Sequence, residues 1–299
     1  MKKVAIFGQT YTVNADKEIK ILLESLEKHK VVVFFEENFY KVLKEHEHLV
    51  KKYPTFSSFE DLNNSFDLFF SLGGDGTMLR AITYVRDLNI PILGINTGRL
   101  GFLANIQKNA ISESIDLLIA KEYRIQERTL LSIKTDPEEE KISELSFALN
   151  EITIARKNTT SMIGVKTYLN NEYLTNYWSD GLIIATPTGS TGYSLSCNGP
   201  VISPDSKSLI ITPIAPHNLN ARPMVIPDNT TIQLEVDSRE KNFLISLDSR
   251  ITSVPKNTKI YIQKSPFTIK SIIPSNQSFL TTLRTKLLWG EDTRNESNL

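Results

Sequence analysis

Hydrophobic and polar positions in the first third of the chain alternate between the spacing of strands and that of helices. Four short apolar runs are typical of buried parallel strands: residues 4–7, 31–35, 66–72 and 90–95. Between the first two runs, Ile19, Leu22 and Leu26 recur at helical spacing. Two more helices are expected at 39–52 and 78–87. This alternation predicts a doubly wound parallel sheet.

Beyond about residue 125 the pattern changes to short β-branched runs separated by turn residues. Strands are expected at 151–155, 163–169, 182–185, 209–211, 231–236 and 243–247. Near the end, Leu280, Leu283 and Leu287 stand in amphipathic order, which predicts a closing helix that packs on the first domain. The predicted fold class is α/β with two domains. A Rossmann-like parallel-sheet domain spans 1–126 and is joined by the C-terminal segment 275–299, and a β-rich domain spans 127–274.

Composition narrows the class of protein without identifying it. The 299 residues include 34 Lys plus Arg and 34 Asp plus Glu, so the formal net charge is zero and no nucleic-acid or anionic-membrane partner is expected. No apolar run approaches the ~18 residues of a membrane span. The apolar run at the start is too short for a signal peptide, and Cys197, the single cysteine, excludes an internal disulfide. We therefore expect a cytoplasmic enzyme or binding protein.

The turn Gly73-Gly74-Asp75-Gly76-Thr77 follows directly on the third apolar run. Ligands of open α/β folds bind at this place, beyond the carboxyl end of a strand that leads into a helix. Glycines allow a phosphate to approach the backbone closely. An aspartate among them would repel phosphates, so we expect Asp75 to act as a general base, to orient a hydroxyl or to share in magnesium binding. The alternative is an ordinary turn with Asp75 as the helix N-cap.

A second block, residues 179–196, places many Ser, Thr and Gly residues after an apolar strand. Hydroxyls and free amides there would line phosphates and ribose, and Tyr193 could stack on a base; the alternative is a hairpin with solvent-facing hydroxyls. Asn150-Glu151 begins a strand and, by itself, is a solvated pair. His217 is interpreted as a structural hydrogen-bonding residue. The G-x-x-x-x-G-K-[ST] and G-x-G-x-x-G patterns are absent, which argues against a P-loop NTPase and an ordinary dehydrogenase.

Taken in chain order, these blocks resemble the NAD kinase family. The matching segments are GGDGT (73–77), INTGRLGFLA (95–104), LNEI (149–152), SDGLIIATPTGSTGYSLSCNGP (179–200), PIAPHNLNARPMVIP (213–227), ISLDSR (245–250) and FLTTLRTKLLW (279–289). The first turn alone also fits diacylglycerol and sphingosine kinases and phosphofructokinases, from which the later blocks separate this chain. The resemblance implies a phosphotransferase that moves the γ-phosphoryl group of ATP to the adenosine ribose 2′-hydroxyl of NAD, giving NADP.

The resemblance also implies roles for individual residues. Asp75 matches the catalytic aspartate, the general base for the ribose hydroxyl. The implied NAD-binding residues are Asp75, Gly76, Arg80, Phe102, Asn150, Glu151, Ser161, Trp178, Asp180, Thr191, Gly192, Tyr193, Ser194, Leu195, Ser196, Ala215 and Arg250. A divalent metal, Mg²⁺, is expected without assigned ligands, and family members form homodimers or homotetramers. Three positions depart from the family: Gly192 replaces a common alanine, Trp178 stands where a basic residue is frequent, and Arg250 adds a positive charge.

Two other functions compete with this interpretation. A lipid or sphingoid kinase would share the first turn, but it would need an apolar acyl-chain cavity and commonly a membrane-docking surface. A module that senses NAD(P) without phosphorylating it would not need a carboxylate beside phosphates, so Asp75 argues against it.

Overall fold

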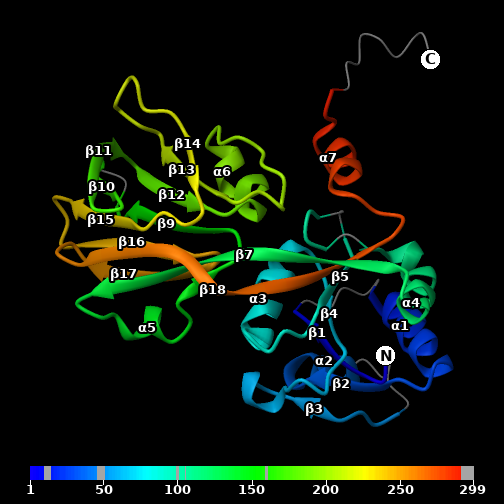
Figure 1. Cartoon of the computed structure of the whole chain (residues 1–299). Helices are drawn as coiled ribbons and strands as arrows, with labels where there is room; N and C mark the ends of the chain where they lie inside the picture. Colours follow the sequence, from blue (N-terminus) through cyan, green and yellow to red (C-terminus); the bar gives the residue numbers. More distant parts are fainter. Residues whose placement is uncertain (10–14, 46–50, 99–100, 105, 159–160, 291–299) are drawn as a thin grey trace. The chain divides into compact units, whose positions relative to one another are not determined.

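The computed structural model describes residues 1–9, 15–45, 51–98, 101–104, 106–158 and 161–290. The chain divides into two compact units, described separately below (Figure 1). Unit 1 comprises residues 1–126 and 269–299, and unit 2 comprises residues 127–268. Within the described ranges, every helix is too short or too polar to cross a membrane.

Unit 1 is built on a parallel sheet whose strand order is β3-β2-β1-β4-β5. The strands are β1 (Lys3–Gly8), β2 (Val32–Glu36), β3 (Thr55–Phe56), β4 (Leu68–Leu72), β5 (Ile92–Asn96) and β6 (Ile106–Gln107), the last pairing with β5. The helices are α1 (Ala15–Lys28), α2 (Glu37–Glu45), α3 (Asp75–Val85), α4 (Ile111–Ala120) and α7 (Phe279–Leu287), with short 3-10 turns η1 (Phe59–Asp61) and η2 (Lys108–Ala110). The order reverses between β1 and β4, where open α/β sheets bind their ligands.

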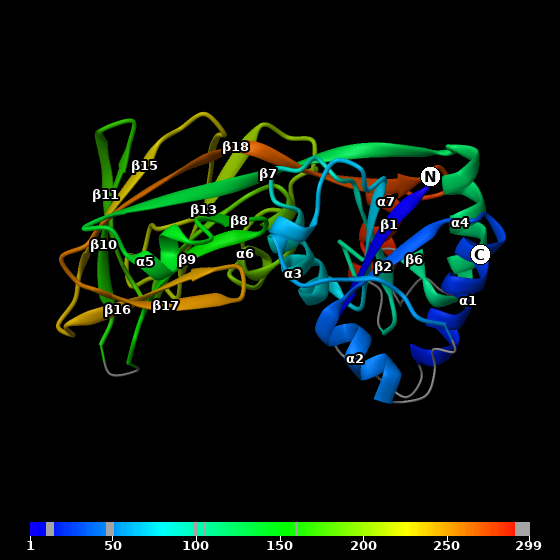
Figure 2. The same cartoon turned by 90° about the horizontal axis from the view of Figure 1, so that it is seen from below.

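The core of unit 1 explains why its strands are continuous apolar runs. All five residues of β4 and all five of β5 are buried, as both faces of a covered parallel sheet require. Helices α1 and α4 lie side by side in both views of Figures 1 and 2. His29 at the end of α1 contacts Asp116 of α4, with 3.2 Å between Nε2 and Oδ1. The rigid sheet therefore fixes the carboxyl ends of β1 and β4.

Element boundaries differ from the sequence prediction at two places in unit 1. Helix α3 begins at Asp75, and its N-cap is Gly74, which has no side chain to cap it. The alternative that Asp75 is an N-cap is therefore wrong, and its carboxylate is free for another role. Helix α2 ends at Glu45, well before the predicted residue 52, and part of the remaining stretch, 46–50, lies outside the described residues.

Unit 2 contains two antiparallel sheets. One has the order β14-β13-β12-β9-β16-β17, and in the other β11-β10-β15 continues to β18, which also pairs with β7. The strands are β7 (Tyr123–Asp136), β8 (Phe147–Ala148), β9 (Glu151–Arg156), β10 (Ile163–Leu169), β11 (Glu172–Ser179), β12 (Gly181–Ala185), β13 (Ser208–Ile214), β14 (Met224–Pro227), β15 (Ile232–Asp237), β16 (Asn242–Leu247), β17 (Arg250–Pro255) and β18 (Lys259–Pro274). Short helical turns are α5 (Glu140–Ser143), η3 (Thr188–Thr191) and α6 (Tyr193–Ser196). Strands β7 and β18 carry the chain between the units.

The main core of unit 2 lies between its two sheets. Alternate residues of β10 and β15, such as Val165 and Leu234, belong to the same buried cluster as Leu182 and Ile184 of β12. The other face of β12 is also buried, because Ile183 joins a second cluster packed against residues around Cys197. Burial on both faces explains why the β12 sequence is an unbroken apolar run. The chain after β12 is thereby held against the sheet.

Candidate functional site

Asp75 holds three consecutive backbone N–H groups in unit 1. Its Oδ2 accepts from the N–H of Phe102 at 2.8 Å, and its Oδ1 accepts from Leu103 and Ala104 at 3.0 Å each. A carboxylate offers about four lone-pair positions, so roughly one stays open for another donor. The side chain is half-buried. We call this arrangement the Asp75 clamp; it fixes the direction of the carboxylate and leaves room for a ligand hydroxyl.

The glycines around Asp75 separate into two kinds. A Cβ on Gly101 would lie 1.7 Å from Asp75 Oδ1, so only glycine allows the loop to come this close to the carboxylate. Among the described residues, no atom lies within 4 Å of a Cβ built on Gly74 or Gly76. The Asp75 clamp therefore requires a glycine at position 101, whereas Gly74 and Gly76 border space that a ligand can enter.

Arg80 lies one helical turn after the glycine turn and is exposed. It lines a pocket of about 200 Å³ with Gly8 and Tyr84, at the carboxyl ends of β1 and β2. Glu36, buried in the same pocket, accepts the Phe39 N–H at 2.8 Å. The family resemblance implied that Arg80 binds NAD, and its place beside the switch point of the sheet fits an anionic ligand.

Asp248 makes a second clamp of the same kind in unit 2. It stands at the two-residue turn between β16 and β17, with φ of 53°, and accepts the N–H groups of Leu149, Asn150 and Glu151 at 3.0, 2.8 and 3.2 Å. We call this the Asp248 clamp. It explains how neighbouring residues at the start of β9 are held in fixed positions. Asp248 lies within the ISLDSR block, but its role could not be predicted from the sequence.

Glu151 is a buried carboxylate with one unpartnered oxygen. Burial, and to a lesser extent the nearby Asp248, raise its pKa to about 7, while the hydrogen bond from the Tyr193 N–H opposes this rise. Burial also raises the pKa of Asp248, but its three N–H donors and Arg250 oppose that rise. Glu151 is therefore the member of the pair that keeps a proton near neutral pH. Its Oε2 and the Oδ1 of Asn150 are buried and have no hydrogen-bond partner among the described residues, so this pair is suited to binding polar groups of a ligand.

The hydroxyl-rich segment after β12 forms η3 and α6, so the alternative of a hairpin is wrong, and several of the amides expected to be free are bonded within the segment. The N–H of Gly192 bonds Gly189 O at 2.8 Å, and the N–H of Leu195 bonds Gly192 O at 3.2 Å. Ser194 is fully buried, with its Oγ 2.8 Å from Thr212 Oγ1. Tyr193 is 45% exposed, so its ring is available for stacking. The remaining predicted residues here, Thr191, Leu195 and Ser196, are exposed or half-buried.

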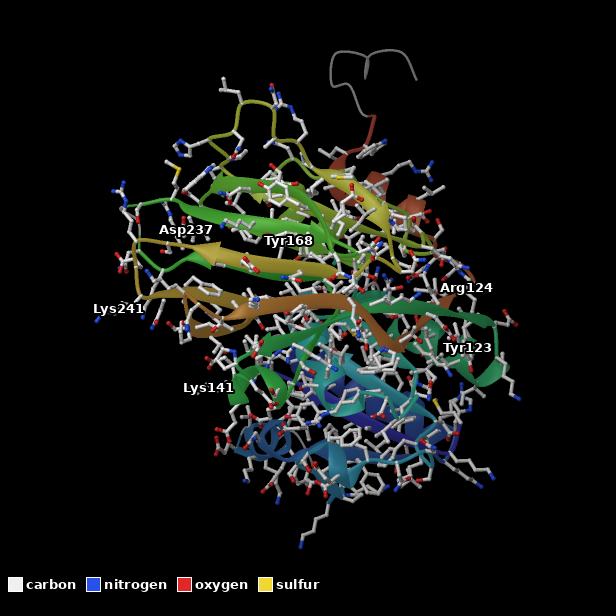
Figure 3. All side chains as sticks on the ribbon, turned by 60° about the vertical axis from the view of Figure 1, so that its left-hand side comes forward. Tyr123, Arg124, Lys141, Tyr168, Asp237 and Lys241 are labelled. Carbon is white, nitrogen blue, oxygen red and sulfur yellow. The ribbon has the colours of Figure 1, made fainter. Side chains whose placement is uncertain are left out.

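Trp178 borders a separate pocket of about 500 Å³ in unit 2, lined also by Arg156, Ser161, Met162, His217, Ser238, Arg239 and Asp237 at the end of β15 (Figure 3). Arg156 pairs with Asp180 at 2.9 Å. The N–H of His217 donates to Trp178 O at 2.7 Å, which agrees with a structural role for the backbone of that histidine. Ser161, Trp178 and Asp180 are thus neighbours, and Ala215 follows nearby with φ of 43°.

Arg250 is directed inward, toward the backbone. Its guanidinium donates to the carbonyls of Leu145, at 2.8 Å, and Phe147, and lies 5.4 Å from the Phe147 ring centroid. These contacts hold the segment before the Asp248 clamp. The extra positive charge noted in the sequence is therefore bonded to backbone carbonyls and also opposes the rise in the pKa of Asp248 that burial causes.

Comparison with known proteins agrees with this geometry. A model of the ATP-NAD kinase N-terminal domain matches residues 4–123, and one of the ATP-NAD kinase C-terminal domain matches residues 149–274. The chain belongs to the NAD kinase family. An NAD kinase of Christiangramia forsetii and one of Flavobacterium psychrophilum are each 55% identical over 293 residues, covering 98% of this chain and 100% of the relative. The resemblance stated from the sequence is confirmed.

Solved structures of the NAD kinase family share the fold. A yeast NADH kinase complexed with NADH has a TM-score of 0.87 at 22% identity, covering 99% of this chain and 89% of that one. An NAD kinase from Archaeoglobus fulgidus in complex with ATP has a TM-score of 0.74 at 26% identity, covering 96% and 98%. The predicted class, a parallel-sheet α/β domain with a β-rich C-terminal domain, is confirmed.

Proposed function

We propose that this chain phosphorylates NAD with Asp75 as the residue that receives the adenosine ribose 2′-hydroxyl. The Asp75 clamp carries the proposal: three N–H groups orient the carboxylate, and its remaining acceptor position borders the open space over Gly74 and Gly76. The hydroxyl oxygen attacks the γ-phosphorus of ATP, the bond to the β–γ bridging oxygen breaks, and ADP leaves. The hydroxyl proton passes to Asp75 and then to solvent.

The clamp favours alignment over strong base catalysis. In a loose phosphoryl-transfer transition state the hydroxyl loses its proton late, so positioning and charge neutralisation dominate. A carboxylate already held by three donors is well suited to directing one hydroxyl and poorly suited to moving. We therefore assign Asp75 mainly the orientation of the nucleophile, with proton acceptance following.

A divalent metal ion, expected as Mg²⁺, is also part of this proposal. Among the described residues, no group of three His, Cys, Asp or Glu side chains could hold a metal ion. Magnesium in phosphoryl-transfer sites is bound mostly through substrate phosphates, with one or two protein carboxylates. Three N–H groups and the ribose hydroxyl would fill the acceptor positions of Asp75, so we do not assign it as a metal ligand. When bound, Mg²⁺ would neutralise charge on the ATP phosphates, and we propose that it enters with the nucleotide.

Unit 2 supplies the polar groups for the dinucleotide in this proposal. Asn150 and protonated Glu151 have buried oxygens with no partner in the part of the chain that the structure describes, and Tyr193 offers an exposed ring for stacking on a base. The Trp178 pocket, with Asp180 and Ser161, is assigned to the nicotinamide end. We also propose a cytoplasmic homo-oligomer; the exposed apolar residues Met224 and Val225, neighbours on β14, support an assembly surface.

Purified protein incubated with ATP, Mg²⁺ and NAD tests the proposal directly. We expect NADP, identified by an NADP-specific dehydrogenase, and ADP in equal amounts. Parallel reactions with polyphosphate as donor and NADH as acceptor define the substrate range. Binding of NAD without product under any donor would indicate a sensing module, and phosphorylation of a sphingoid base or diacylglycerol instead would indicate a lipid kinase; either result would overturn the proposal.

A further inference from the structure

Helix α7, drawn in red in Figure 1, packs on Phe102 within unit 1. The ring centroids of Phe279 and Phe102 are 6.5 Å apart, and Lys286 Nζ lies 5.2 Å from the Phe102 centroid. Phe279 and Lys286 are seven residues apart, with the buried Leu283 between them, so all three lie on one face of the helix. One side of α7 thus meets Phe102 at both its ends.

Phe102 links this face of α7 to Asp75. Its ring contacts the helix, while its own N–H donates to Asp75 Oδ2 at 2.8 Å. Gly101, directly before it, is the residue that allows the close approach to the carboxylate. Moving the ring would therefore move the amide that orients Asp75. The contact path runs from the C-terminal helix to the reacting carboxylate through one residue.

We propose that Lys286 and Phe279 are positioning residues for Asp75, acting through the ring of Phe102. A cation within about 6 Å of an aromatic centroid is attracted to the ring, and paired rings add a similar contribution. Helix α7 begins at a capped N-terminus, where Ser278 Oγ accepts the Thr281 N–H at 3.1 Å, so its register on Phe102 is fixed. The inference rests on the proposed role of Asp75.

Lys286→Met removes the charge and keeps most of the side-chain length. A cation–π contact at an exposed site corresponds to about a two- to fivefold effect, so we expect kcat to fall by that factor with the KM for ATP unchanged. Lys286→Arg should restore kcat, because a guanidinium also binds an aromatic face. Arg284→Gln is the matched control: it removes a positive charge from the same helix at an exposed position that has no ring contact with the described residues. Lys286→Arg and Arg284→Gln should melt at the wild-type temperature, and Lys286→Met should melt no more than about 4 °C below it.

A double-mutant cycle with Phe102→Leu tests whether Lys286 and Phe279 act on Asp75 through the ring of Phe102. In the Phe102→Leu background, Lys286→Met should have no further effect on kcat, and Phe279→Leu should behave in the same way. An equal kcat in wild type and Lys286→Met, an effect matched by Arg284→Gln, or an undiminished effect in the Phe102→Leu background would each overturn the inference. Failure of the proposed function would be distinct, because the wild type itself would then form no NADP.

Discussion

Asp75 in unit 1 and Asp248 in unit 2 each accept three consecutive backbone N–H groups, yet their surroundings differ. The Asp75 clamp faces open space over two glycines, and no buried acid lies among its hydrogen-bond partners. The Asp248 clamp stands at a hairpin turn, and its partners include Glu151, whose pKa it helps to raise. The same local geometry therefore presents a carboxylate to a ligand in one unit and supports ligand-binding residues in the other.

Replacing the clamp aspartate of unit 1 should give the largest effect on catalysis. Asp75→Asn keeps the size of the side chain but removes its charge and turns one acceptor oxygen into a donor that faces a backbone N–H, so some stability should be lost and kcat for NADP formation should fall about 10²–10⁴-fold. NAD binding, measured by calorimetry, should be largely kept. Asp87→Asn, an exposed position shortly after α3, is the control and should match the wild type. Wild-type turnover in Asp75→Asn would remove Asp75 from the mechanism.

Glu151, the buried acid beside the Asp248 clamp, should make the free energy of unfolding of unit 2 depend on pH. The folded-state pKa of Glu151 is raised from 4.5 to about 7, so its protonated form is favoured by folding. This contribution is fully present below the unfolded pKa and is lost as pH rises through about 7. The rise corresponds to roughly 3 kcal/mol, so the free energy of unfolding should decrease from pH 5 to pH 8 by up to about that amount.

Urea unfolding followed by tryptophan fluorescence can measure this change in unit 2 alone. The chain has two tryptophans, and a Trp289→Phe background leaves Trp178 as the reporter. Glu151→Gln should flatten the pH dependence, because an amide has no proton to lose in this range. A slope that persists in Glu151→Gln would assign the effect to another group.

Much of the unit 1 site could be predicted from the sequence, because a strand, a glycine turn and a helix are contiguous. The position of Asp75 at a strand end follows from local pattern alone. Its partners do not, since they lie 27 to 29 residues away, and those of Asp248 lie 97 to 99 residues away. Similarly, the Ser/Thr/Gly-rich segment forms η3 and α6 partly because Gly189 packs on the backbone of Asn150, a contact that no local propensity encodes.

Replacing the clamp aspartate of unit 2 should affect stability more than catalysis. Asp248→Asn turns part of the acceptor into a donor that faces backbone N–H groups, which should lower the free energy of unfolding by about 2 kcal/mol. It also removes the negative charge near Glu151, so the pH dependence described above should shrink. Glu172→Gln, exposed at the start of β11, serves as the control. A kcat loss as large as that of Asp75→Asn, without loss of stability, would contradict the division of roles.

The smallest effect is expected for Gly192→Ala, which tests how closely the chain packs around Asn150 and Glu151 in unit 2. A Cβ on Gly192 would lie 2.9 Å from Glu151 Oε2 and 3.4 Å from Asn150 Nδ2. Gly192→Ala should displace the flexible end of Glu151 by a few tenths of an ångström, changing the free energy of unfolding by less than about 1 kcal/mol. Because the displaced oxygen is one that we assign to the dinucleotide, the KM for NAD should rise about two- to threefold with kcat unchanged. If kcat fell instead, the residues around Glu151 would act on the transferring group itself, and the contrast between an aligning clamp in unit 1 and a supporting clamp in unit 2 would no longer hold.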